Sequence, residues 1–196
     1  MTNKSRPGRL RIVAGKWRSR LLDIADVPGL RPTSERIRET LFNWLAPTIQ
    51  GARCLDLFAG TGALGLEALS RDASEVVFVE KSAVAAKALR ANAQLLEATG
   101  ADVRQEDALE TLDTAGPEVF DIVFLDPPFA DERLDDLCRL LDKSSLLDAG
   151  SLIYLEDDRA RDEVDLPPGW TLLKSKTAGN VRYSLAQVED RDQRSL

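Results

Sequence analysis

Two short motifs in this chain of 196 residues bring together groups that could bind a nucleotide-like ligand and act on an amine. The first motif, Asp56-Leu-Phe-Ala-Gly-Thr-Gly-Ala-Leu-Gly65, follows an apolar run and opens a helical stretch. The second, Asp126-Pro-Pro-Phe129, places a carboxylate, a rigid turn and an aromatic ring after another apolar run. Together they indicate methyl transfer to a ring-bound amine.

The glycine motif predicts a nucleotide-like cofactor. Gly60, Gly62 and Gly65 have the spacing that lets backbone N–H groups and a helix N-terminus meet a polar ligand. NAD-binding proteins share this spacing, and Glu80 after the next strand could accept ribose hydroxyls from either cofactor. Asp56, just ahead of the loop, suits the cationic ammonium of S-adenosylmethionine and suits a pyrophosphate poorly. The motif therefore favours S-adenosylmethionine.

Further candidates for cofactor contacts follow the predicted strands. Asp107 could accept a hydrogen bond from the adenine amine while an apolar neighbour packs on the ring; an exposed loop carboxylate is the alternative. The predicted cofactor-binding residues are Asp56, Phe58, Gly60, Gly62, Glu80, Lys81, Asp107 and Ala108. The chain has no histidine and no Cys-x-x-Cys, so we expect no metal.

The second motif is predicted to carry the reaction. Methyl transfer from a sulfonium is an in-line displacement that depends on positioning and needs no histidine. Hydrogen-bond acceptors around the two protons of an exocyclic amine expose its lone pair, and the Asp126 carboxylate and a backbone carbonyl of the Pro127-Pro128 turn can serve as such acceptors. Phe129 would stack on the extruded base. These four residues are the catalytic candidates.

The elements that must position these motifs alternate between strand and helix. Strands are predicted over residues 53–57, 75–80, 101–105, 120–125 and 151–155, and helices over residues 63–70, 83–98 and 133–141. Another helix is expected after Thr33 or Ser34, and antiparallel hairpins are expected near each end, over residues 10–24 and 170–188. This order predicts an α/β fold with a mostly parallel sheet and right-handed crossovers.

Charge is distributed unevenly along the chain. The net charge is -7, yet residues 1–50 hold ten Lys and Arg against four Asp and Glu. This asymmetry predicts a localised anion-binding surface on an acidic body, with a solvated basic tail as the alternative. Cys54 and Cys138 lie within apolar patterns and are expected to be reduced core thiols. No apolar run of about 18 residues could cross a bilayer, and we expect a cytoplasmic protein.

The motifs resemble those of the class I S-adenosylmethionine-dependent methyltransferases that modify amino groups. The segments Leu10-Arg-Ile-Val-Ala-Gly-Lys-Trp-Arg-Ser-Arg20 and Arg31-Pro-Thr-Ser-Glu-Arg-Ile-Arg-Glu-Thr-Leu-Phe-Asn-Trp-Leu45 are similar to the bacterial RsmD family. That family makes N2-methylguanine in 16S ribosomal RNA. The resemblance implies a Rossmann-like fold with a seven-stranded sheet, helices on both faces, a C-terminal antiparallel hairpin and a basic N-terminal β-hairpin that meets RNA.

The resemblance also implies a domain organisation. We expect a hairpin extension over residues 1–30, a methyltransferase domain over residues 31–190 and a polar tail over residues 191–196. The substrate implied is the small ribosomal subunit or an assembly intermediate, and a monomer is expected. The RNA-binding candidates are Arg9, Arg11, Lys16, Trp17, Arg18, Arg31 and Arg38.

Other readings use some of the same residues. A DNA adenine-N6 methyltransferase or a protein-glutamine methyltransferase would use a similar turn, usually Asn-Pro-Pro-Tyr for glutamine. An NAD-dependent oxidoreductase would share the glycine loop but would have no use for Asp126-Pro-Pro-Phe129. A non-catalytic RNA-binding module would not need Glu80 and Asp107 at strand ends. The basic N-terminal segment favours a nucleic-acid substrate.

Overall fold

The computed structural model describes residues 8–27, 30, 32–114, 116–128, 134–161 and 164–190. Its helices are α1 (Glu35–Leu45), α2 (Ala63–Ser70), α3 (Ala83–Leu95), α4 (Ala108–Thr114) and α5 (Leu134–Lys143). Its strands are β1 (Arg9–Arg11), β2 (Leu21–Asp23), β3 (Arg53–Asp56), β4 (Glu75–Val79), β5 (Ala101–Arg104), β6 (Ile122–Leu125), β7 (Leu152–Asp158), β8 (Trp170–Ala178) and β9 (Val181–Val188). No helix in these segments is long and apolar enough to cross a membrane.

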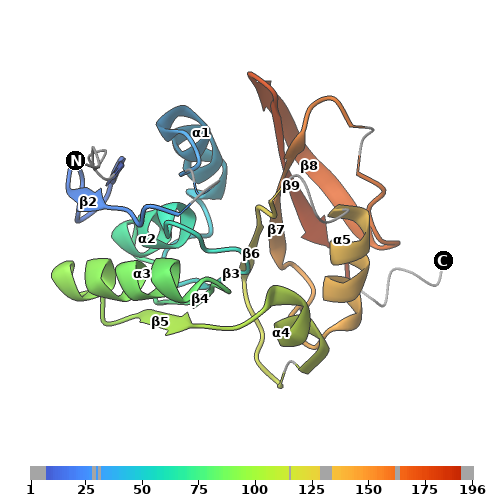
Figure 1. Ribbon diagram of the computed structural model, residues 1–196. Helices are drawn as coiled ribbons and strands as arrows, with labels where there is room; N and C mark the ends of the chain where they lie inside the picture. The colour runs from blue at the N-terminus through green and yellow to red at the C-terminus, as the bar shows by residue number, and fades with distance from the viewer. Residues whose placement is uncertain are drawn as a thin grey trace.

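Seven of the strands form one sheet in the order β5-β4-β3-β6-β7-β9-β8 (Figure 1). Strands β3 to β7 are parallel, whereas β9 runs antiparallel to β7 and to β8. Strands β1 and β2 form a separate antiparallel pair. The predicted mostly parallel sheet and both hairpins are therefore confirmed.

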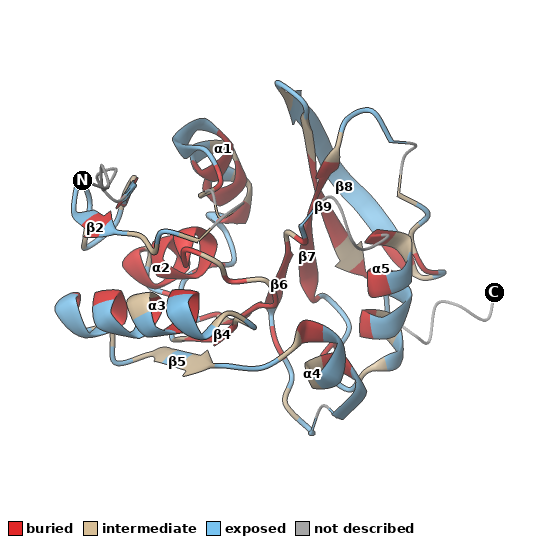
Figure 2. Cartoon of the chain, viewed as in Figure 1, coloured by how far each residue is buried: buried red, intermediate tan, exposed pale blue. Residues whose placement is uncertain are grey.

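The parallel strands bury alternate side chains in two cores, as expected when helices cover both faces of a sheet. Phe78 and Phe124 belong to the core beneath α1, α2, α3 and the N-terminal hairpin. Their chain neighbours Val77 and Val123 belong to the core beneath α4 and α5. Figure 2 shows the burial concentrated along the middle strands and the inner sides of the helices. Cys54 and Cys138 are free and buried, as predicted.

Some elements differ from the prediction. Helix α4 has only seven residues, of which Ala108 and Leu112 are buried, so its apolar period is too short to read from sequence. Strand β7 continues to Asp158, and β8 continues to Ala178, beyond the expected ends at 155 and 174. Most residues of both extensions are polar, and they belong to strands because each extension pairs with β9.

The N-terminal hairpin is attached to α2 through polar contacts. The Glu67 carboxylate accepts hydrogen bonds from the backbone N–H groups of Val13 and Ala14, at 2.8 and 2.9 Å. The turn packs so closely that a Cβ on Gly15, which has a φ of +81°, would lie 1.8 Å from the carbonyl oxygen of Ser70. The hairpin is therefore held in one position on the body of the protein.

Candidate active site

The two sequence motifs meet at the carboxyl edge of the parallel strands. The strand order reverses between β3 and β6, and in an open α/β sheet ligands bind outside the strand ends at such a point. Asp56 is the last residue of β3 and pairs in register with Phe124 of β6. Asp126 is therefore two residues beyond that pair, on the same face of the sheet.

Asp126 is held by the segment that leads into α1. The hydroxyl group of Thr33 donates a hydrogen bond to Asp126 Oδ2 at 3.2 Å. Ser34, the other predicted cap, caps α1 by accepting from the backbone N–H of Ile37. Burial raises the pKa of Asp126 to about 6, against the lowering effect of the Thr33 hydrogen bond. The carboxylate thus has one fixed donor and an environment that favours binding of a positive or proton-donating group.

The remainder of the Asp126 motif is only partly described. Pro127 is buried and Pro128 is exposed, so the turn is anchored at its first proline and open at its second. Phe129 lies outside the described residues, and its predicted stacking role stays a prediction.

A second carboxylate beside Asp126 was missing from the predicted site. Leu125 pairs in register with Leu155, so Asp126 lies beside Glu156 on the neighbouring strand β7. Glu156 is 6% exposed, and its Oε2 accepts a hydrogen bond from the Tyr154 hydroxyl at 2.6 Å. Burial, with a further contribution from the charge of Asp126, raises the pKa of Glu156 to about 8. The alternation Tyr-Leu-Glu could have placed Glu156 on the same face of the strand as Tyr154, but the predicted strand ended at residue 155.

The raised pKa values of three carboxyl groups at this edge predict how the stability of the folded state depends on pH. Burial raises the pKa of Asp56 to about 7, and the pKa values of Asp126 and Glu156 are raised to about 6 and about 8. In the unfolded chain, Asp and Glu have pKa values of about 3.9 to 4.3. Above that pH the folded state therefore binds more protons than the unfolded state. The stabilisation is complete below about pH 4 and is lost as pH rises through the folded pKa values.

Thermal melting across the neutral range tests this prediction. We expect Tm to fall between about pH 5.5 and about pH 8.5, by about 2–4 °C for each kcal/mol lost. Glu156→Gln, which cannot ionise, should show a smaller fall than the wild type. Equal falls in both proteins would mean that Glu156 is not protonated in the folded state.

The glycine loop between β3 and α2 has the backbone shape expected of a ligand cradle. Gly60 and Gly62 have φ values of +52° and +77°, in the left-handed region that favours glycine. A Cβ at Gly65 would lie 2.1 Å from the Phe78 ring, so this third glycine allows α2 to pack closely on β4. The loop therefore uses two glycines for its conformation and one for helix packing.

Glu80 lies directly against this loop. Its Oε2 accepts a hydrogen bond from the Gly60 N–H at 2.8 Å, and its Oε1 accepts one from the Ser82 N–H at 2.6 Å. An ionised carboxylate offers about four acceptor positions, so about two remain for ligand hydroxyl groups. The structure thus brings Glu80 and the loop together, and this arrangement fits a ribose-containing ligand.

Asp56 lies deeper than the sequence prediction implied. Its side chain is buried, and Oδ2 accepts a hydrogen bond from the Gly65 N–H at 3.1 Å. Burial is the main cause of its raised pKa, and the charges of Asp126 and Glu80 add to the effect. An ammonium group that came close would favour the ionised form of Asp56.

The third set of cofactor candidates lies after β5. Asp107 Oδ2 forms an ion pair with Lys81 Nζ at 2.7 Å, and Asp107 Oδ1 accepts from the Leu109 N–H at the start of α4. The Lys81 hydrogen bond is the main cause of the lowered pKa of Asp107. Phe58 is half-buried, and Ala108, the first residue of α4, is buried. The pair Lys81–Asp107 spans the gap between the β4 and β5 ends.

The structure corrects one RNA-binding candidate. Arg38 is 1% exposed, and its guanidinium donates to Glu67 Oε2 at 3.1 Å, to the Thr33 carbonyl and to the Arg11 carbonyl. A side chain enclosed in this way cannot reach a phosphate, so the prediction for Arg38 was wrong. It was made because Arg38 falls off the predicted apolar stripe of α1, and the sequence did not show that the hairpin covers that side.

The other basic candidates lie at the surface. Arg9, Arg11, Lys16 and Arg18 are exposed, and Trp17 is half-buried beneath the Lys16 ammonium, which lies 4.4 Å from its ring centroid. Arg9 and Arg11 form loose, exposed ion pairs with Asp23 and Glu35, at 3.4 and 3.6 Å. Arg31 lies outside the described residues.

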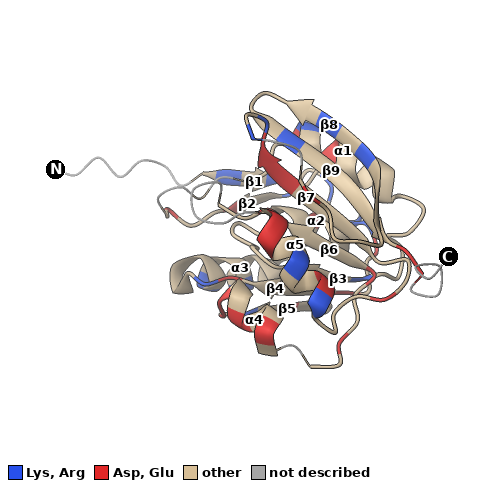
Figure 3. Cartoon of the chain, turned by 90° about the vertical axis from the view of Figure 1, so that its right-hand side faces the viewer, with Lys and Arg blue, Asp and Glu red and all other residues tan. Residues whose placement is uncertain are grey.

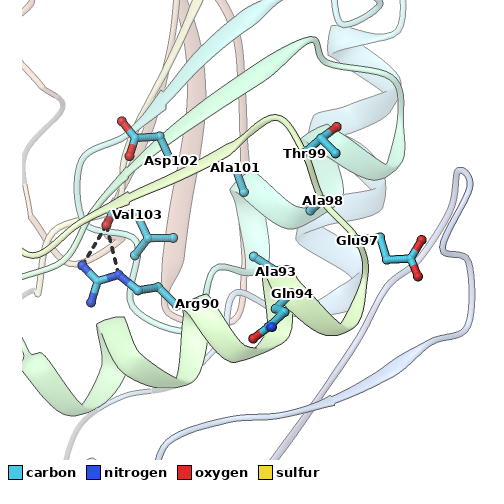
Figure 4. A pocket seen from close by; sticks show the side chains of 9 residues that line it. All are labelled: Arg90, Ala93, Gln94, Glu97, Ala98, Thr99, Ala101, Asp102 and Val103. Atoms are coloured by element: carbon cyan, nitrogen blue, oxygen red, sulfur yellow. Dashed lines mark hydrogen bonds between the residues drawn. The ribbon is translucent and has the colours of Figure 1, made fainter.

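A pocket of about 530 Å³ lies away from this edge, between α3 and β5 (Figure 4). None of the predicted site residues lines it. Arg90 extends along one side, and its guanidinium donates two hydrogen bonds to the Val103 carbonyl, at 3.2 and 2.8 Å. The pocket is thus a recess where α3 covers the edge strand of the sheet, and it is separate from the candidate active site.

Comparison with known proteins agrees with this geometry. A family model described as conserved hypothetical protein 95 matches residues 10–187. Ribosomal RNA small subunit methyltransferase D of Escherichia coli (strain K12) is 44% identical over 187 residues, which cover 95% of this chain and 94% of that protein. The chain belongs to the RsmD family. The predicted family is confirmed, and with it the enzyme class: the chain is a methyltransferase.

Other members of the RsmD family extend the likeness to structure. A relative of the same name from Haemophilus influenzae is 44% identical over 183 residues, covering 92% of this chain and 94% of that protein. The solved structure of yhhF from Escherichia coli matches with a TM-score of 0.86 and 41% identity, covering 94% of this chain and 100% of that chain. The similarity therefore extends over nearly the whole chain.

Proposed function

We propose that this RsmD-family enzyme transfers the methyl group of S-adenosylmethionine to the N2 amine of one guanine in 16S ribosomal RNA. The single observation that carries the proposal is the position of Asp126. Its carboxylate stands at the sheet's switch point on a proline turn, with Thr33 as its fixed donor and the glycine loop on the adjacent strand. Such a group can accept a hydrogen bond from the exocyclic amine of a base brought to this edge.

The proposed cofactor site is the loop around Gly60 and Gly62 with the acids beside it. Glu80 would accept the ribose hydroxyls, Asp56 would face the methionyl ammonium, and Asp107 with Lys81 would border the adenine. The bound cofactor supplies an electrophilic methyl group. The left-handed glycines and the remaining acceptor positions of Glu80 support this assignment.

The proposed chemistry uses the chain's own residues for orientation and for one proton. Asp126 and a carbonyl of the Pro127-Pro128 turn accept hydrogen bonds from the two N–H groups of the amine, which exposes the nitrogen lone pair. Phe129 stacks on the base. Once the nitrogen carries the methyl group it loses a proton, to water or to the Asp126 carboxylate, whose raised pKa makes it a better acceptor than an ordinary aspartate.

The exposed basic hairpin is the proposed RNA contact. Replacing Arg9, Arg11 and Arg18 by Ala should weaken RNA binding and flatten its salt dependence by about one unit of slope for each lost phosphate contact. The control replaces Lys87, Arg139 and Lys143, which lie on α3 and α5, and removes the same charge. Binding to small-subunit RNA at several salt concentrations measures both slopes. An equal slope of log affinity against log salt in the two triple variants would show that the hairpin does not contact the RNA.

The proposed substrate is the small subunit or a ribonucleoprotein assembly intermediate in the cytoplasm, approached by a monomeric enzyme. In this proposal residues 1–30 act as the RNA-contacting extension and residues 31–190 as the methyltransferase domain. The relatives named for the small ribosomal subunit support this choice.

Transfer of labelled methyl groups tests the acceptor class. The enzyme would be offered unmodified small subunits, their deproteinised RNA, double-stranded DNA and ribosomal protein in parallel. Label is expected in the RNA of the first sample or of the first two. Label in DNA or in protein instead would favour the adenine-N6 or the glutamine alternative.

A further inference from the structure

A row of side chains crosses the sheet from Asp126 to its outer edge. Asp126 lies beside Glu156, Glu156 pairs in register with Tyr183 of β9, and Tyr183 pairs with Lys176 of β8. Registered partners point to the same face of a sheet. Lys176 therefore projects from the same face as the Asp126 carboxylate.

A second lysine lies on the same face. Lys174 pairs in register with Leu185, which belongs to the core on the α1 side of the sheet. Leu172 pairs with Ala186, which belongs to the core on the other side. The register shift between Leu172 and Lys174 leaves Lys174 and Lys176 two residues apart on the α1 side. Both lysines are exposed.

Contacts with α1 fix the position of Lys176. Trp44 of α1 stacks on Tyr183 with ring centroids 5.5 Å apart, and the Lys176 ammonium lies 6.0 Å from the Trp44 centroid. The aromatic pair joins α1 to β9, and the Lys176 ammonium lies over its Trp44 ring. Lys176 thus lies beside α1, on the sheet face that carries Asp126.

The charges around these lysines leave them available to an anion. In the described part of the chain neither lysine forms an ion pair. The acid in the row, Glu156, is buried, and its carboxylate accepts a hydrogen bond from the Tyr154 hydroxyl. Figure 3 shows Lys and Arg along β8 and β9, Asp and Glu on α4 and at the end of β7, and both kinds of charge on α5. The two lysines thus form a local positive surface that can attract phosphate groups, although the chain has a net charge of -7.

The spacing suits a nucleic-acid strand. Three strand intervals separate Asp126 from Lys176, which is about 14 Å at about 4.8 Å each. That length corresponds to about four stacked nucleotides at about 3.4 Å. The basic N-terminal hairpin and β8 lie on opposite sides of the catalytic edge (Figure 1).

We propose that Lys174 and Lys176 on the α1 face of β8 bind backbone phosphates of the RNA strand that flanks the target guanosine. The inference rests on the proposed RNA substrate and adds a second contact surface to the hairpin. With the hairpin on one side and β8 on the other, the target nucleotide is held across Asp126.

The test compares Lys174→Ala/Lys176→Ala with Lys87→Ala/Lys143→Ala, which removes the same charge from α3 and α5. With small subunits that lack the modification as the substrate, the slope of log affinity against log salt should flatten by about 1.4 to 1.8 in the β8 variant alone. KM for RNA should rise about tenfold while kcat at saturating RNA stays within about twofold, because binding is lost and chemistry is not. Cofactor affinity should be unchanged.

The outcomes separate this inference from the proposed function. A wild-type enzyme that methylates RNA, together with a β8 variant that matches the α3/α5 control in slope and KM, would overturn the β8 contact. A wild-type enzyme that transfers no label to the RNA of small subunits would overturn the proposed function itself. Loss of kcat in the β8 variant without a change in slope would also contradict the phosphate role, since it would place the lysines in the chemistry.

Discussion

Replacing Asp126 by Ala should lower the rate of methyl transfer by about 10²–10⁴, the range typical of a positioned acid-base group, while cofactor binding stays nearly intact. The reason is geometric. In the proposed mechanism Asp126, which receives a hydrogen bond from Thr33, accepts a hydrogen bond from the target amine. The glycine loop between β3 and α2 makes a separate contact with Glu80. Single-turnover transfer to small subunits, with calorimetric titration of the cofactor, measures both quantities.

Two further variants sharpen this prediction. Asp126→Asn keeps one acceptor oxygen and should lose less activity than Asp126→Ala. Asp113→Ala, an exposed acid on α4, removes the same charge away from the edge and should turn over at the wild-type rate. Near-wild-type turnover by Asp126→Ala would contradict the role given to this carboxylate.

The largest expected loss of stability comes from the buried ion pair of Glu67 and Arg38. Both side chains are at most 2% exposed, and Glu67 also accepts hydrogen bonds from Val13, Ala14 and Arg71. Glu67→Ala would leave the Arg38 guanidinium buried without its counter-charge and would free the hairpin backbone. Removing one partner of a buried pair costs about 3–5 kcal/mol. Chemical denaturation of the full chain measures the free energy of unfolding.

A surface ion pair of similar length is the control. Arg53 and Glu75 are 2.9 Å apart but about 40% exposed, at 39% and 40%, so Glu75→Ala should cost about 0–1 kcal/mol. Glu67→Gln, which retains an acceptor for the hairpin N–H groups, should fall between the two. A Glu67→Ala variant as stable as Glu75→Ala would show that the hairpin is not fastened through this pair.

Patterns within the sequence were sufficient to predict most of the fold. The alternation of short apolar runs and helical stretches predicted the parallel sheet, and Gly179-Asn180 predicted the terminal hairpin. Both motifs could be placed at strand ends because each follows an apolar run. The parallel order then brings Asp56 and Asp126 to one edge, since β3 and β6 are neighbours.

The remaining features depend on contacts between distant segments. Arg38 is polar by type, yet the hairpin folds over it and it pairs with Glu67, which lies 29 residues further along the chain. Glu156 lies in a strand extension that exists only because β9 pairs with it. The β8 lysines share a face with Asp126 through a register shift that no local pattern marks. Such pairings are set by tertiary structure, and sequence periodicity alone does not specify them.

The most direct test of the central claim is the identity of the methylated nucleoside. Small subunits that lack the modification would be incubated with the enzyme and labelled S-adenosylmethionine, and the RNA would be digested to nucleosides. We predict a single labelled product, N2-methylguanosine, and its loss with Asp126→Ala. Label on another base or another atom of guanine, or no label in RNA from an enzyme that binds the cofactor, would contradict the role assigned to Asp126-Pro-Pro-Phe129.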